Sequence, residues 1–139
     1  MNEEKTATGT NWVVIAGTRT YTNYEQMRAE TTEILKEIPN AGIISGGATG
    51  ADALAKRYAQ EHLLPYWEMP AKWNEEGRAA GPLRNARMAN EATYTLVYWD
   101  NRSQGTLNML HNARRQKHKK IYVYLYEHDV QHTETNTTY

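Results

Sequence analysis

Five short apolar runs alternate with helical repeats along this chain of 139 residues. The runs are nearly continuous, as in WVVIAG at residues 12–17, and such a run is typical of a strand that is buried on both faces. Apolar residues at helical spacing separate most of the runs. This alternation predicts an α/β fold, a single Rossmann-like three-layer sandwich with a central, mostly parallel, five-stranded sheet.

The predicted elements and domains follow from this pattern. Strands are expected within 12–19, 41–45, 64–70, 93–100 and 120–126, with helices at 24–38, at 51–58, from about Leu83 onward, and at 105–116. One domain accounts for most of the chain, because this length buries one continuous core. We expect a flexible N-terminal segment at 1–10, the Rossmann-like domain at 11–126 and a polar C-terminal tail at 127–139.

The amino-acid composition of the chain argues against several kinds of partner and binding site. Lys+Arg and Asp+Glu both number 16, which gives no electrostatic case for a nucleic-acid or membrane partner. The chain has no Cys, so disulfides, thiolate metal sites and Cys nucleophiles are excluded. Its five His residues are scattered without metal-ligand spacing, and we expect neither a metal nor a cofactor.

Unusual residues gather where the predicted strands end. Ligands of open parallel sheets bind outside the carboxyl ends of the strands. The clusters here are Gly17-Thr18-Arg19, the loop 45–50, the segment 73–87 and the loop 100–106. We therefore expect loops from separate strands to converge into one anion-binding cleft.

The loop SGGATGAD, which begins at Ser45, carries the clearest mechanism. Glycines between a strand and a helix let backbone N–H groups turn toward an anion at the positive end of the helix. The loop is neither a Walker loop, which ends in Lys-Ser/Thr, nor a G-x-G-x-x-G fingerprint. Two interpretations stay open, an anion cradle or a tight turn without a ligand. Asp52 either compensates the helix dipole or accepts a hydrogen bond from a ribose hydroxyl.

Arginines near the strand ends are candidate anion ligands. Arg19, Arg84 and Arg78 offer fork-shaped donors that suit phosphate or carboxylate. Arg114 and Arg115 end a predicted helix, where cations interact favourably with the dipole, and we expect them to be solvated.

Two further features lie close to the strand ends. SQGT, at 103–106, repeats the arrangement of a glycine before a helix, with Gly105 permitting close approach and Thr106 offering a hydroxyl. Trp73 and Trp99 either stack on a base or belong to the core.

Four segments, taken together, resemble the YAcAr/YspA-like branch of the SLOG superfamily. They are AGTR, ISGGATGADALAKRYA, PAKWNEEGRAAGPLRNARMA and WDNRSQGTLNML, and the resemblance runs from Trp12 to Tyr126. It implies the Rossmann-like fold of a superfamily that also holds Lonely-guy-type phosphoribohydrolases and DNA processing protein A. Members of the branch occur in bacteria and tailed phages, and related SLOG domains sense ADP-ribose-type signals.

The resemblance and the strand-end clusters together predict a nucleotide pocket. Its expected ligand-binding residues are Gly17, Thr18, Arg19, Ser45, Gly46, Gly47, Gly50, Asp52, Trp73, Arg84, Asn85, Gly105 and Thr106. Lonely-guy-type enzymes carry a catalytic glutamate where this chain has Met109, and a thioether cannot act as an acid or a base.

We therefore expect binding, sequestration or sensing of a small nucleotide derivative, ADP-ribose-like or cyclic, rather than catalysis. In a phage such a chain would act as a sponge against host immune signalling. The alternative is a hydrolase that cleaves an N-glycosidic or phosphoester bond, with Asp52 and Glu76 as candidate catalytic residues.

The sequence also predicts the cellular location and the partners of the protein. Met1 starts no signal peptide, which predicts a cytoplasmic location, that of the host if the chain is phage-encoded. The expected partner is a nucleotide-derived small molecule, and we expect neither a membrane nor nucleic acid. The apolar YVYLY predicts an edge strand that needs cover, so we expect a homo-oligomer.

Overall fold

The computed structural model describes residues 9–127. The predicted N-terminal segment 1–10 therefore lies outside the described residues except for its last two positions. The predicted tail 127–139 lies outside them except for Glu127.

The described chain alternates strands and helices in the predicted order. The strands are β1 (Asn11–Gly17), β2 (Ala41–Ser45), β3 (Tyr66–Glu68), β4 (Tyr94–Trp99) and β5 (Lys120–Leu125). The helices are α1 (Tyr24–Leu35), α2 (Ala51–Glu61), α3 (Trp73–Glu76), the 3-10 turn η2 (Gly77–Ala79), α4 (Ala80–Glu91) and α5 (Gln104–Arg115).

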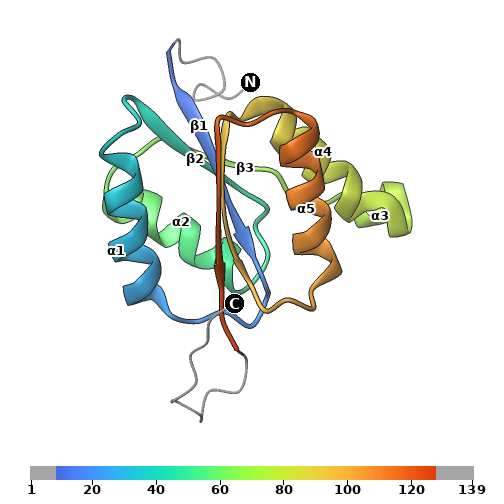
Figure 1. Ribbon diagram of the computed structural model, residues 1–139. Helices are drawn as coiled ribbons and strands as arrows, with labels where there is room; N and C mark the ends of the chain where they lie inside the picture. Colours follow the sequence, from blue (N-terminus) through green and yellow to red (C-terminus); the bar gives the residue numbers. More distant parts are fainter. Residues whose placement is uncertain (1–8, 128–139) are drawn as a thin grey trace.

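All five strands form one parallel sheet in the order β3-β2-β1-β4-β5. Helices α1 and α2 cover one face, and α4 and α5 cover the other (Figure 1). The predicted Rossmann-like three-layer sandwich is thereby confirmed, and the sheet is parallel throughout.

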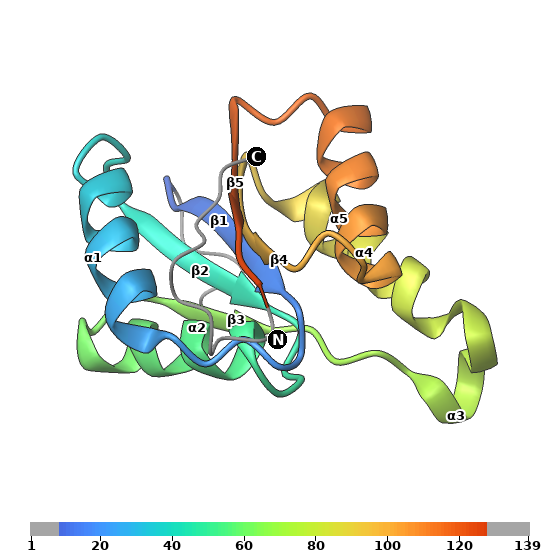
Figure 2. The same ribbon diagram turned by 60° about the horizontal axis from the view of Figure 1, so that its bottom comes forward.

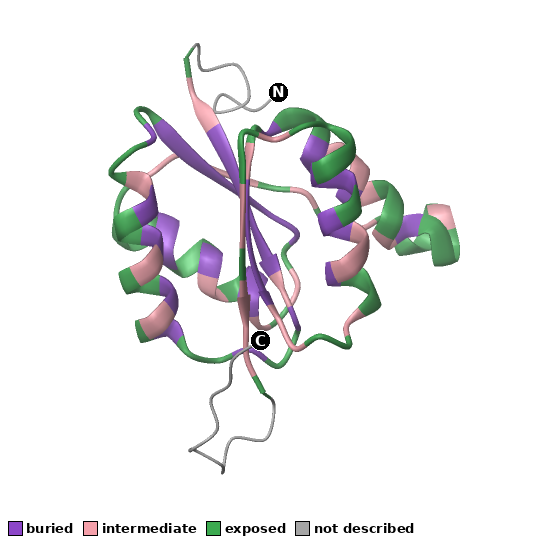
Figure 3. Cartoon of the chain, viewed as in Figure 1, coloured by how far each residue is buried: buried purple, intermediate pink, exposed green. Residues whose placement is uncertain are grey.

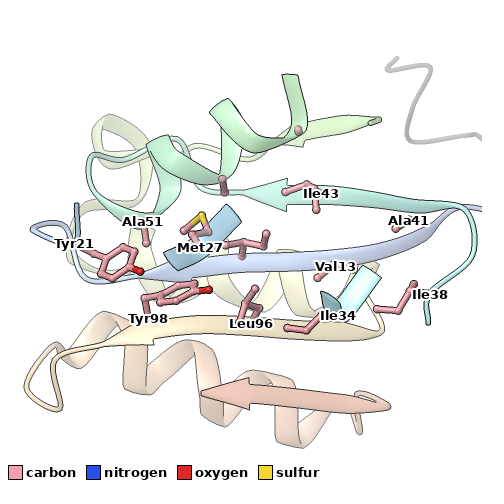
Figure 4. Packing of buried hydrophobic residues seen from close by; sticks show 13 residues of the cluster. Val13, Tyr21, Met27, Ile34, Ile38, Ala41, Ile43, Ala51, Leu96 and Tyr98 are labelled. Carbon is pink, nitrogen blue, oxygen red and sulfur yellow. The ribbon is translucent and has the colours of Figure 1, made fainter. Parts of the chain in front are cut away.

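Alternate side chains of β1 point to opposite faces of the sheet and contribute to two hydrophobic cores. Val13 and Ile15 point toward the α1 and α2 layer, whereas Val14 and Ala16 point toward the α4 and α5 layer. Figure 4 shows the first core, in which the Tyr21 and Tyr98 rings stack with centroids 4.5 Å apart. Apolar burial on both faces explains why the strands are continuously apolar in sequence.

The segment between β3 and α4 differs from the prediction. A helix was expected from about Leu83, but α4 begins at Ala80 and includes Pro82 in its first turn. Proline is tolerated there because the first N–H groups of a helix have no intrahelical acceptor. The short helix α3 and the turn η2 precede it, and this segment extends away from the sheet (Figure 2).

The strand order reverses direction between β1 and β4. The chain winds from β1 outward to β3, returns through α4 and continues with β4 on the other side of β1. Gly17 ends β1 at this point, and a Cβ there would lie 2.3 Å from the Tyr98 carbonyl oxygen. A glycine is therefore required for β1 and β4 to stay paired up to the point where their loops separate.

Candidate nucleotide-binding site

A cavity of about 530 Å³ lies at the carboxyl ends of β1 and β4, where the strand order reverses. This is the position at which open α/β sheets bind ligands, and the volume is within the range of small-molecule sites. The predicted site residues that line it are Gly17, Thr18, Arg19, Asp52, Trp73, Arg84, Asn85, Gly105 and Thr106. Loops from both helical layers therefore meet in one cavity.

Four predicted site residues do not line this cavity, namely Ser45, Gly46, Gly47 and Gly50. Ser45 is fully buried, and its hydroxyl donates to the Asp52 carbonyl at 3.2 Å. The three glycines lie in the loop between β2 and α2, beside the cavity wall rather than on its surface.

Protein atoms fill the space that these glycines leave open. A Cβ on Gly46 would lie 2.1 Å from Arg84 Nη1, and one on Gly47 would lie 2.8 Å from the Glu68 carboxyl carbon. At Gly50, where φ is 73°, a Cβ would lie 2.4 Å from the Arg19 carbonyl. Because protein groups occupy these positions, the geometry favours the tight-turn interpretation of the loop over the anion cradle.

Arg84 reaches into this loop from the start of the second turn of α4. Its Nη1 donates to the carbonyl oxygens of Gly46 at 3.0 Å and Met69 at 3.3 Å, and its Nε donates to Asn85 Oδ1 at 3.1 Å. Burial lowers the pKa of the guanidinium, while the nearby Asp52 carboxylate opposes that effect. Arg84 thus joins the β2–α2 loop and the end of β3 to α4 and also contributes positive charge to the cavity wall.

Asp52 lies in the first turn of α2 and is 6% exposed. Burial raises the pKa of its carboxyl, and the Ala48 N–H, Arg84 and Arg19 oppose the rise. The Ala48 N–H donates to Oδ2 at 3.1 Å. Asp52 therefore places a hydrogen-bond acceptor in the cavity wall, close to two arginines.

The beginning of α5 forms the opposite wall. Ser103 caps the helix by accepting a hydrogen bond from the Thr106 N–H at 3.2 Å. Asn85 Nδ2 donates to the Gly105 carbonyl at 3.2 Å, which fixes this turn against α4. Among residues 9–127, the backbone N–H groups of Gln104 and Gly105 have no hydrogen-bond acceptor. Both residues line the cavity, so these two donors are available to an anion.

Trp73 stands at the start of α3 with 51% of its surface exposed. It lines the cavity together with Gly81, whose Cβ position is 3.6 Å from the indole ring. Trp99 does not line the cavity, and its Nε1 donates to the Ser103 carbonyl at 3.0 Å, which supports the loop before α5. Of the two tryptophans, Trp73 is the one positioned to stack on a ligand.

Three further charged groups near the strand ends, Glu76, Arg78 and Asp100, do not line the cavity. Glu76 forms an ion pair with Arg87 at 2.6 Å and does not line the cavity, whereas Asp52 does. Arg78 is exposed in η2 and does not line the cavity. Asp100 accepts hydrogen bonds from the Arg102 and Ser103 N–H groups, both at 2.9 Å.

Several lining residues are not among the predicted ligand-binding residues. They are Ala16, Ala48, Gly81, Pro82, Met88, Ser103, Gln104, Asn108 and Met109. Ser103 had a usable signal, because a serine directly before a helical repeat is a preferred N-cap. Met88 and Asn108 had none, because only the packing of α4 against α5 brings them to the cavity.

The part of the chain that the structure describes contains neither a metal-binding cluster nor a helix that could span a membrane. Within residues 9–127, no group of three or more His, Asp or Glu side chains is arranged to hold a metal ion. None of the helices in the described part of the chain combines the length and apolar character that crossing a bilayer requires.

Comparisons with known proteins agree on the fold. A sequence model of YAcAr, the YspA, cpYpsA-related SLOG family, matches residues 12–75. DNA processing protein A from Helicobacter pylori, which binds single-stranded DNA, has a similar structure with a TM-score of 0.58 and 20% identity. The likeness covers 81% of this chain and 64% of that one. No curated protein matches the sequence.

The likeness to DNA processing protein A corrects one prediction. We expected nucleic acid not to be a partner, and this is wrong, because a protein with the same fold binds single-stranded DNA. The expectation rested on the zero net charge of the whole chain. Net charge does not report local charge, and here Arg19 and Arg84 line one cavity.

Proposed function

Since this chain belongs to the SLOG superfamily, as its motifs predicted, we propose that it captures a small nucleotide-derived ligand in the cavity between α2, α4 and α5. Membership implies nucleotide-related binding. The observation that carries the proposal is that Arg19, Asp52 and Trp73, whose side chains suit a phosphate, a ribose hydroxyl and a base, all line one cavity of about 530 Å³.

The phosphate end of the ligand is assigned to the beginning of α5. The unpaired N–H groups of Gln104 and Gly105 lie at the positive end of that helix. Arg19 lines the same cavity, and its side chain is exposed. A phosphate between them would accept charge-assisted hydrogen bonds from both sides.

The nucleoside end of the ligand is assigned to Trp73 and Asp52. The exposed indole ring of Trp73 offers a flat surface for a base. The Asp52 carboxylate, which keeps acceptor capacity beyond its single bond from Ala48, suits a ribose hydroxyl. An ADP-ribose-like molecule or a cyclic nucleotide carries both groups that these residues would recognise.

We propose capture of the ligand rather than its turnover. Met109 lines the cavity at the position of the Lonely-guy-type glutamate, and Glu76 is paired with Arg87 outside it. Asp52 is then the one carboxylate among residues 9–127 that lines the cavity. In a phage setting, capture alone would remove a host immune signal from solution.

The test is recovery of the bound molecule. ADP-ribose and cyclic AMP are each incubated with purified protein, the protein is denatured, and the small molecules are quantified by mass spectrometry. We expect intact ligand in a fixed ratio to protein. Product in stoichiometric excess would replace capture with hydrolysis, and Asp52→Asn would then abolish turnover while sparing binding. Failure of both probes to bind in native mass spectrometry would count against this ligand class.

A second candidate function is binding of single-stranded nucleic acid. The observation that favours it is the likeness to DNA processing protein A, which binds single-stranded DNA. The exposed Arg19 and Trp73 suit a phosphate and a base of a strand equally well. Affinity for a short oligonucleotide that exceeds mononucleotide affinity and falls steeply with salt would favour this function.

A further inference from the structure

The two edges of the sheet are protected to very different degrees. The edge strand β3 has three residues, ends in the charged Glu68 and is flanked by Pro65 and Pro70. Short length, charge and proline are the devices that keep a sheet edge from pairing with other strands. The other edge strand, β5, has six residues and no proline, and Lys120 is its only charged residue.

Strand β5 is also incompletely covered. It pairs with β4 on one side, and among residues 9–127 no strand pairs with its other side. Val123, at its centre, is 39% exposed, whereas Leu96, Val97 and Tyr98 of the adjacent β4 are fully buried. Figure 3 shows this contrast, with β1, β2 and β4 mostly buried and β5 of intermediate or exposed character. An unprotected apolar edge of this kind is suited to pairing with another strand.

We propose that the occupant of this edge is β5 of a second copy of the chain, paired antiparallel about a two-fold axis at Val123. Each Val123 then lies opposite its own counterpart. Tyr122 lies opposite Tyr124 of the second copy, and Ile121 lies opposite Leu125. The two five-stranded sheets become one continuous sheet across the interface.

Side-chain character supports this register. Tyr122 and Tyr124 pack on the core shared with α1, and Ile121 packs on the opposite core. Opposite residues of an antiparallel pair project from the same face, so aromatic residues meet aromatic residues and aliphatic residues meet aliphatic residues. The pairing therefore continues both layers of each copy without exposing either core.

Charge supports the same register independently. Four residues before Val123 stands Lys119, and four residues after it stands Glu127, both exposed. Antiparallel pairing about Val123 places Lys119 of each copy opposite Glu127 of the other, which gives two ion pairs. A register shifted by two residues would lose both pairs, so the charges select this alignment.

The test is the mass of the protein in solution, measured by sedimentation over a range of concentrations. We expect the wild type to be a dimer. Val123→Lys places two lysines face to face at the axis and is expected to give a folded monomer. Lys119→Glu and Glu127→Lys are each expected to weaken the dimer about ten-fold, because each replaces two attractive contacts with two repulsive ones. The double variant Lys119→Glu/Glu127→Lys should recover the dimer.

Controls separate pairing from folding. Glu91→Lys makes the same charge change as Glu127→Lys at an exposed position at the end of α4 and should leave the dimer intact. Circular dichroism shows whether each variant is folded. A wild type that is monomeric at all concentrations, or a dimer that Val123→Lys leaves intact, would overturn the proposal. Failure of the double variant to recover the dimer would overturn the antiparallel register, even if Val123→Lys does not fold.

Discussion

At the scale of single residues, two arginines that line the same cavity have different roles. Arg84 directs its guanidinium at protein oxygens, those of Gly46, Met69 and Asn85. Arg19 has an exposed side chain in the loop after β1. The sequence offered both as anion ligands and favoured Arg84, because a guanidinium that donates to carbonyl oxygens cannot be told from one that binds a phosphate by sequence alone. Substitution distinguishes a residue that supports the cavity from one that binds a ligand.

Arg19→Ala is expected to weaken binding of ADP-ribose about ten-fold without changing the free energy of unfolding, since one charge-assisted hydrogen bond contributes about 1.5–3 kcal/mol. Arg84→Ala is expected to lower both affinity and stability, the latter by about 2–3 kcal/mol, because buried carbonyl groups lose their donor. Calorimetry and urea unfolding measure the two effects. Arg114→Ala, at the exposed end of α5, is the matched control and should change neither. Equal effects of Arg19→Ala and Arg114→Ala would place the phosphate elsewhere.

Trp73→Leu tests the stacking surface. The side chain is 51% exposed, so its loss should change stability little. Loss of base stacking should weaken nucleotide binding by about 1–3 kcal/mol. Ribose 5-phosphate, which has no base, should bind the variant and the wild type equally. An equal loss of affinity for both ligands would show that Trp73 shapes the cavity rather than holding the base.

Asp52 should make stability depend on pH. Burial raises the pKa of its carboxyl above 3.8, the ordinary value. As the pH falls toward that value, the folded protein binds this proton before the unfolded chain does. The wild type should therefore gain stability relative to Asp52→Asn between neutral pH and about pH 4. Urea unfolding of both proteins across this range measures the difference. A difference that does not change with pH, or that changes in favour of Asp52→Asn on acidification, would contradict the burial of a titrating carboxyl.

At the scale of elements, the beginnings of α2 and α5 use glycine in opposite ways. Gly50 precedes α2 in a left-handed conformation, with φ at 73°, and protein atoms crowd its Cβ position. Gly105 lies in the first turn of α5, and a Cβ there would have no neighbour within 4 Å. The fold therefore requires Gly50, whereas nothing among residues 9–127 requires Gly105. Gly105 lines the cavity, so a methyl group added there tests the proposal that this space takes a ligand.

Gly105→Ala should separate stability from function. Alanine in a helical turn is expected to stabilise the fold by about 0.5–1 kcal/mol relative to glycine. The added methyl group occupies cavity space, so affinity for the nucleotide should fall about ten-fold or more, a change of at least 1.4 kcal/mol. Gly50→Ala should instead lower the melting temperature. Calorimetry and thermal unfolding check both variants, and unchanged affinity in Gly105→Ala would remove the α5 turn from the site.

Helices and strands could be predicted from the sequence where the apolar pattern lies within the element itself. The strands and the helices α1, α2 and α5 follow from runs and repeats that lie within each segment. The start of α4 was misplaced because Pro82 suggested a turn, although proline fits the first turn of a helix equally well. The short α3 has only four residues, too few to show a periodic pattern. Its position depends on contacts that sequence does not reveal.

At the scale of the whole molecule, the cavity joins the two helical layers. Arg84 connects α4 to the β2–α2 loop, and Asn85, the next residue, connects α4 to Gly105 and Asn108 of α5. Convergence of the strand ends was predictable, because parallel strands bring their carboxyl ends to one edge of the sheet. The position of the Arg84 guanidinium beside Gly46 was not predictable, because the two residues are 38 positions apart. Either a ligand or a side chain can occupy the space beside a glycine.

A ligand in this cavity should therefore stabilise both layers together. At a concentration one hundred times its dissociation constant, a bound nucleotide raises the free energy of unfolding by about 2.7 kcal/mol. Hydrogen exchange should show added protection in three segments at once, the loop after β1, the beginning of α2 and the first turn of α5, because all three line the cavity. The Gln104 and Gly105 amides should respond most, since they have no acceptor without the ligand among residues 9–127. Protection confined to one helical layer would mean that the ligand binds one loop only, and the cavity would then not act as a single site.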